Sequence, residues 1–155
     1  MSKQKLNASI FINAPRETVW DTLLGYNSYK EWTKSFNPTS RFEGDWSEGS
    51  KILFLGTDEN GENEGGMVSR IARNIQNEYL SIKHLGIVEN GVEDTTSPKA
   101  KSWAPAYENY TLTEKDGGTE FVVEQDLDEE YLPMFKEMWE KALQVLKELA
   151  EKKQN

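Results

Sequence analysis

The sequence predicts an α+β fold in which a curved antiparallel sheet of about seven strands wraps around one long C-terminal helix. Three observations support this prediction. Two short helical segments follow the first apolar strand, glycine-containing turns then separate runs with period-two alternation, and a continuous helical stripe of apolar residues ends the chain. A sheet with one apolar face needs a covering layer, and the last helix supplies it.

The first strand is expected at residues 4–13, where Ile10 and Ile12 alternate with their neighbours. Pro15 then suits the first position of a short helix, since proline lacks the N–H that this position would leave unpaired. We expect Gly25 to end that helix in a left-handed conformation. A second small helix or turn then follows at 26–33.

Residues 39–127 are predicted to form mainly β-hairpins. Dipeptides such as Asn60-Gly61 and Asn90-Gly91 favour tight turns between strands. The expected strands lie near residues 39–43, 50–57, 65–73, 78–88, 106–114 and 118–127. The segment 89–105 is too long for a tight hairpin, and we expect it to be irregular.

A helical period begins near residue 131 and continues to residue 153. Pro133 must lie in its first turn because proline disrupts a helix interior. We expect residues 150–155 to fray. The apolar stripe is formed by Leu132, Phe135, Met138 or Trp139, Leu143, Leu146 and Leu149.

Length and composition limit the possible functions. The 155 residues suit a single domain, 1–155. A net charge of −9 without a basic stripe argues against nucleic acid and anionic membranes as partners. The absence of cysteine excludes disulfides and thiolate catalysis. No apolar run approaches the roughly 20 residues that a membrane helix needs, and the start of the chain lacks a signal core. We therefore expect a cytoplasmic protein.

Strand parity predicts which side chains would line a cavity between the sheet and the helix. Apolar walls with a few polar groups are typical of a ligand site. The expected lining is Trp32, Phe36, Phe54, Ile82, His84, Trp103, Tyr110, Leu112, Phe121, Phe135, Met138 and Trp139. A slip of strand 106–114 by one residue would turn Tyr107 and Asn109 inward instead. Plain core packing is the alternative explanation for each of these residues.

The evidence for catalysis is weaker. His84 is the sole histidine and could act as a proton carrier or a polar anchor, although a structural histidine is the simpler interpretation. Glu108 and Glu124 are expected to point outward, so no buried acid pair is predicted. Hydrolase, metalloprotease and phosphate-loop motifs are missing. The acidic segment 58–64 departs from a calcium loop at its sixth position, Asn63. We predict no catalytic residues, no cofactor and no metal site.

Several strings resemble a known superfamily. INAPRETVWDTLLGYNSYKEW (12–32) is similar to the opening strand and helix of SRPBCC, or START-like, domains, and FEGDWSEGSK (42–51) to their next turn. YENYTLTEKDGGTEF (107–121) resembles a strand pair of the domain related to the activator of the heat shock protein 90 ATPase. The resemblance covers nearly the whole chain, and it implies a helix-grip fold with a hydrophobic cavity.

The resemblance does not imply one activity, because fold and function are separable. Three hypotheses remain open. The first is a module that binds a hydrophobic or amphipathic small molecule between the sheet and the long helix. The second is an interaction domain of the co-chaperone kind, with a chaperone as partner. The third is an enzyme of the polyketide cyclase or hydrolase kind.

Overall fold

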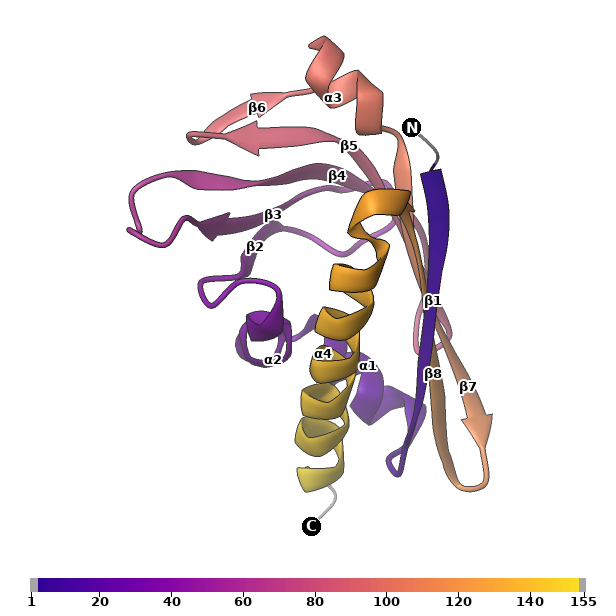
Figure 1. The fold of residues 1–155 in the computed structure, drawn as a ribbon. Coiled ribbons are helices and arrows are strands. Elements are labelled where there is room, and N and C mark those ends of the chain that lie inside the picture. The colour runs from indigo at the N-terminus through magenta and orange to yellow at the C-terminus, as the bar shows by residue number, and fades with distance from the viewer. Residues whose placement is uncertain (1–2, 154–155) are drawn as a thin grey trace.

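The computed structural model describes residues 3–153. Figure 1 shows a curved sheet with a long helix, α4 (Leu132–Lys152), lying across its concave face. Two short helices, α1 (Arg16–Leu24) and α2 (Tyr26–Trp32), lie beside α4 and follow the first strand. This is the expected α+β helix-grip architecture.

The strands form one antiparallel sheet. Their bounds are β1 (Lys3–Ile12), β2 (Arg41–Gly44), β3 (Lys51–Thr57), β4 (Glu64–Ile75), β5 (Tyr79–Glu89), β6 (Val92–Asp94), β7 (Ala106–Lys115) and β8 (Gly118–Asp128). The order across the sheet is β1-β8-β7-β5-β4-β3-β2, and β6 pairs with the far end of β5 beyond β7. The seven strands of the main path match the seven expected from the sequence.

We expected the segment 89–105 to be irregular, but part of it is regular. It contains β6 and a one-and-a-half-turn helix, α3 (Pro98–Trp103). The Ser97 side chain accepts a hydrogen bond from the Ala100 amide and thereby caps α3. Both elements are too short to show a hydrophobic period, so they escaped the sequence pattern.

The turn at Gly25 also differs from the expectation. Its φ is −62° and its ψ 138°, an extended conformation rather than a left-handed one. Glycine is needed here for space: a Cβ would lie 2.8 Å from the Asp21 carbonyl oxygen and 2.9 Å from Ser28 Oγ. Gly25 is both the last cap of α1 and the first cap of α2. Pro15, expected at the first position of α1, lies at the N-cap position just before Arg16.

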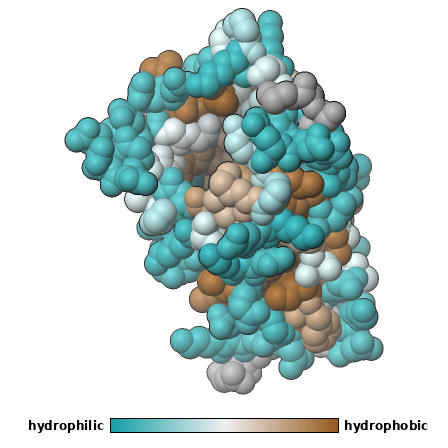
Figure 2. Space-filling model, in the orientation of Figure 1, coloured by the Kyte–Doolittle hydropathy of each residue, from teal (hydrophilic) through white to brown (hydrophobic). Residues whose placement is uncertain are grey.

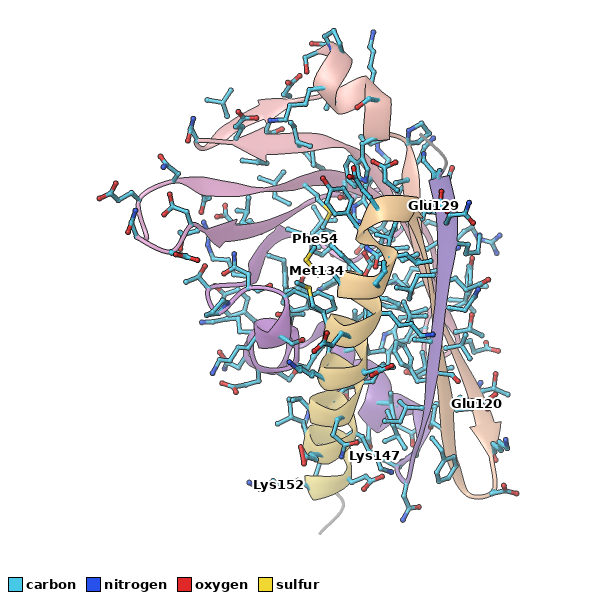
Figure 3. All side chains as sticks on the ribbon, viewed as in Figure 1. Phe54, Glu120, Glu129, Met134, Lys147 and Lys152 are labelled. Carbon is cyan, nitrogen blue, oxygen red and sulfur yellow. The ribbon has the colours of Figure 1, made fainter. Side chains whose placement is uncertain are left out.

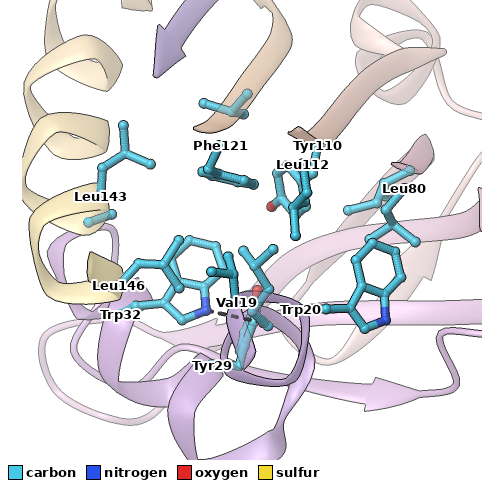
Figure 4. Packing of buried hydrophobic residues seen from close by; sticks show 14 of the residues in the cluster. Val19, Trp20, Tyr29, Trp32, Leu80, Tyr110, Leu112, Phe121, Leu143 and Leu146 are labelled. Atoms are coloured by element: carbon cyan, nitrogen blue, oxygen red, sulfur yellow. Dashed lines mark hydrogen bonds between the residues drawn. The ribbon is translucent and has the colours of Figure 1, made fainter. Parts of the chain in front are cut away.

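The core lies between α4, α1 and the concave face of the sheet. Figure 4 shows Leu143 and Leu146 of α4 facing Phe121 of β8, with Val19 and Trp20 of α1 nearby. We expected residues 150–155 to fray; α4 continues to Lys152 and Ala150 is fully buried, while residues 154 and 155 lie outside the described residues. Within residues 3–153, no helix is both long and apolar enough to cross a membrane.

Candidate functional site

A cavity of about 480 Å³ opens between the first half of α4, the strands β3 and β4, and the 3₁₀ turn after α2. Figure 2 shows a hollow on this face of the molecule, with pale and brown residues inside and polar residues around it. The lining includes eight aromatic side chains, Tyr29, Trp32, Phe36, Phe54, Trp103, Tyr110, Phe135 and Trp139. Apolar walls of this kind are typical of small-molecule sites.

Three glycines of the sheet lie at the cavity. Gly56 of β3 is paired with Gly65 of the neighbouring strand β4, and Gly66 follows Gly65 in the chain. A Cβ on Gly66 would lie 1.8 Å from the Phe54 carbonyl oxygen, and its φ is +152°. The close strand approach therefore requires glycine at position 66, whereas a Cβ on Gly56 would lie 2.6 Å from the Asn37 side chain, which packs on that glycine.

Eight of the twelve side chains expected at the cavity line it, namely Trp32, Phe36, Phe54, Trp103, Tyr110, Phe135, Met138 and Trp139. The other four, Ile82, His84, Leu112 and Phe121, are buried outside the lining. In Figure 3, Phe54 lies between the sheet and the first turns of α4. Contact of any of these residues with a ligand stays a prediction.

The prediction for Glu108 was wrong. Glu108 is only 8% exposed and lines the cavity. Alternate residues of a strand share a face, and β7 buries Ala106, Glu108, Tyr110 and Leu112 in succession. The expectation of an inward Tyr110 should therefore have placed Glu108 inward as well. Glu124 on β8 is half-buried and does not line the cavity.

Three donors surround the Glu108 carboxylate. The Tyr110 hydroxyl donates to Oε2. His84 Nε2 lies 3.1 Å and Gln125 Nε2 3.4 Å from Oε1. Because an ionised carboxylate can only accept, His84 donates to it from Nε2. These contacts hold the carboxylate in one orientation at the cavity wall.

The network continues in both directions. Ser69 of β4 is the register partner of His84 on β5, and Ser69 Oγ lies 2.7 Å from His84 Nδ1. On the other side, Trp139 Nε1 donates to Gln125 Oε1 at 2.7 Å. A polar chain thus runs from the sheet interior to α4, and sequence reasoning found its members only in part.

The line Ser69, His84, Glu108 has the residue types of a hydrolase triad, but its orientation is reversed. In a hydrolase the serine meets the substrate and the acid is buried behind the histidine. Here Ser69 is fully buried and does not line the cavity, whereas Glu108 does. The arrangement suits holding the carboxylate in place and does not expose a nucleophile.

Burial and the Glu108 carboxylate raise the pKa of two tyrosines, Tyr110 and Tyr29. Burial raises the pKa of the Tyr110 hydroxyl well above its ordinary value, and the Glu108 charge raises it further. Burial also raises the pKa of Tyr29, again with a contribution from Glu108. Both phenols are therefore neutral hydrogen-bond donors at the cavity.

The lining contains no Lys or Arg among the described residues, and its formal charges are Glu108 and Asp58. Asp58 is exposed at the loop between β3 and β4. Over residues 3–153, no three His, Asp or Glu side chains gather closely enough to hold a metal ion. Glu108 is thus the one formal charge that this part of the chain buries at the cavity.

Comparison with known structures supports the fold. A protein from Rhizobium leguminosarum matches with a TM-score of 0.73 at 13% identity, covering 97% of this chain and 96% of that one. A protein from Cytophaga hutchinsonii matches at 0.71 and 24%, covering 99% and 98%. The Aha1 dimer from Colwellia psychrerythraea matches at 0.70 and 20%, covering 96% of each chain.

Comparison with curated proteins finds no match. The family model of Activator of Hsp90 ATPase homolog 1-like proteins matches residues 13–151. That range runs from the end of β1 almost to the end of α4, and so includes every side chain of the cavity and of the polar network. The chain therefore belongs to the family of Activator of Hsp90 ATPase homolog 1-like proteins.

Proposed function

We propose that the domain binds a hydrophobic or amphipathic small molecule in the cavity between the sheet and α4. The observation that carries the proposal is a space of about 480 Å³ with eight aromatic side chains in its lining and a buried polar cluster at Glu108. Ligand sites of roughly 300–1,000 Å³ commonly combine such apolar walls with a few fixed polar groups.

The volume supports a ligand with two or three fused rings or a short branched chain. The aromatic walls would contribute contact area, and the carboxylate network would orient one polar end of the ligand. The polar groups are already hydrogen-bonded to each other, so binding needs little reorganisation of the protein.

Titration with the neutral dye Nile red tests this proposal. We expect one dye per chain, with an emission shift to shorter wavelength in an apolar site. Met138→Trp fills the cavity from α4 and should weaken binding at least about tenfold, since overfilled sites lose the space the ligand needs. Gln144→Trp adds the same indole on the exposed side of α4 and serves as the matched control.

Equal dye affinity in wild type, Met138→Trp and Gln144→Trp would contradict the proposal. Native mass spectrometry of protein purified from its own host adds a second readout. A co-purifying small molecule, lost in Met138→Trp and kept in Gln144→Trp, is the expected result.

Family membership favours a second candidate, an interaction with a chaperone ATPase. Among residues 3–153, the exposed large apolar side chains are Phe11, Tyr26, Ile75, Val92, Tyr131 and Met134. Tyr131 and Met134 lie within one turn of each other at the start of α4 and are the natural first targets. Under this hypothesis, Tyr131→Ser with Met134→Ser would abolish stimulation of an Hsp90 ATPase, whereas Val92→Ser would not.

A further inference from the structure

We propose that the ligand of this cavity is a hydrophobic cation, an apolar or aromatic body that carries a protonated amine placed against Glu108. This inference rests on the proposed function, because it names the chemical class of the molecule held there. It predicts that the cavity discriminates between ligands by charge as well as by size.

The buried part of the cavity lining carries a negative charge. Glu108 is buried at the cavity, and no Lys or Arg among the described lining residues balances it. His84, which donates to Oε1 from Nε2 at 3.1 Å, does not line the cavity. A buried carboxylate attracts a cation strongly and repels an anion, because little water screens it. Fatty acids and other carboxylates are therefore poor candidates.

The Glu108 carboxylate has an acceptor position that its described neighbours leave unfilled. An ionised carboxylate offers about four lone-pair sites. His84 and Gln125 reach Oε1, and Tyr110 reaches Oε2, so among the described residues no donor reaches the second lone-pair site of Oε2. An ammonium N–H in the cavity would complete the set with a charge-assisted hydrogen bond.

An aromatic surface lies beside the carboxylate. Tyr110 holds Glu108, and its ring centroid lies 6.4 Å from that of Trp32 and 6.1 Å from that of Trp139. The two indoles lie 5.8 Å apart. Cations are attracted to aromatic faces, and indole is the best of them. A carboxylate next to three aromatic rings is a suitable site for an ammonium group.

Three naphthalene probes of similar size test the inference by isothermal titration calorimetry at pH 7.5. They are 1-naphthylmethylamine, 1-naphthalenemethanol and 1-naphthoic acid. We expect the amine to bind at least about tenfold more tightly than the alcohol, as a charge-assisted hydrogen bond would give, and the acid to bind least. Alcohol binding equal to or tighter than amine binding in wild type would overturn the inference.

Glu108→Gln removes the charge and keeps the shape of the side chain. It should abolish the preference for the amine and leave alcohol binding within about threefold of wild type. Glu124→Gln removes a carboxylate from the neighbouring strand outside the cavity and should change neither value. An undiminished amine preference in Glu108→Gln would overturn the inference. Circular dichroism checks that each variant folds, and the ranking of the probes in wild type is informative without any variant.

The outcomes separate the two proposals. If alcohol and amine bind equally and Met138→Trp weakens both, the ligand site stands and the cation inference fails. If none of the probes nor Nile red binds, the proposed function itself fails.

Discussion

The two halves of α4 face the same sheet with the same kind of amphipathic surface, yet they meet it differently. The C-terminal half buries Leu143, Leu146 and Ala150, and none of these residues lines the cavity. The N-terminal half, with Phe135 and Met138, faces the glycine-containing strands β3 and β4 across the cavity. The hydrophobic pattern of a helix therefore predicts which of its faces is covered. The layer opposite that face decides whether the space between them is a filled core or a cavity.

The largest effect that can test this contrast comes from truncating one side chain in each half. Leu146→Ala should destabilise the fold by about 2–5 kcal/mol, because it opens a void in a filled core. Met138→Ala should cost less than about 1 kcal/mol, because its side chain already borders open space. Urea unfolding followed by circular dichroism measures both. Equal losses would show that the two halves are packed alike.

Trp139 lies where the two halves join, and its substitution should have an intermediate effect. Trp139→Phe keeps most of the ring and removes the donor to Gln125 Oε1. The buried acceptor left unpaired should cost about 1–3 kcal/mol. Adding Gln125→Leu removes both partners, so the double variant should lose less stability than the two single variants summed. A strictly additive double variant would mean that the hydrogen bond contributes nothing.

Alkaline pH should reveal the hollow half through its tyrosines, with the smallest effect. The pKa of Tyr110 is raised in the fold, so the folded chain keeps a proton that the unfolded chain releases near pH 10. Its contribution to stability is therefore present below pH 10 and lost as pH rises above it, by up to about 1.4 kcal/mol per pH unit. Tyr110→Phe should reduce this slope in unfolding experiments from pH 9 to 11. Tyr131→Phe, at an exposed position, should keep the slope of the wild type.

Much of the fold could be predicted from the sequence, because long strands and a 21-residue helix carry strong periodic signals. The helix α3 and the strand β6 could not, since three to six residues are too few to show a period. Gly25 was interpreted through its usual role at helix ends, whereas contacts with Asp21 and Ser28 are what require glycine there.

The candidate site was predictable to the extent that it follows parity. The inward position of Tyr110 was expected, and the same rule applied two residues earlier would have found Glu108. The outward position predicted for Glu108 contradicts the inward position predicted for Tyr110, because the two residues share a face of the strand. Ser69 is different: a β-bulge lies between Val68 and Ser69, and strand alternation alone does not reveal such an irregularity.

The contact between Trp32 and Trp139 has a practical consequence. Two indoles at 5.8 Å, tilted by 31°, are close enough for their excited states to couple, and both border the cavity. Any occupant that touches either ring would alter the near-ultraviolet dichroism and the emission of the pair. The domain thus contains its own optical sensor, and a library of small molecules can be screened against it without a label or a competing dye.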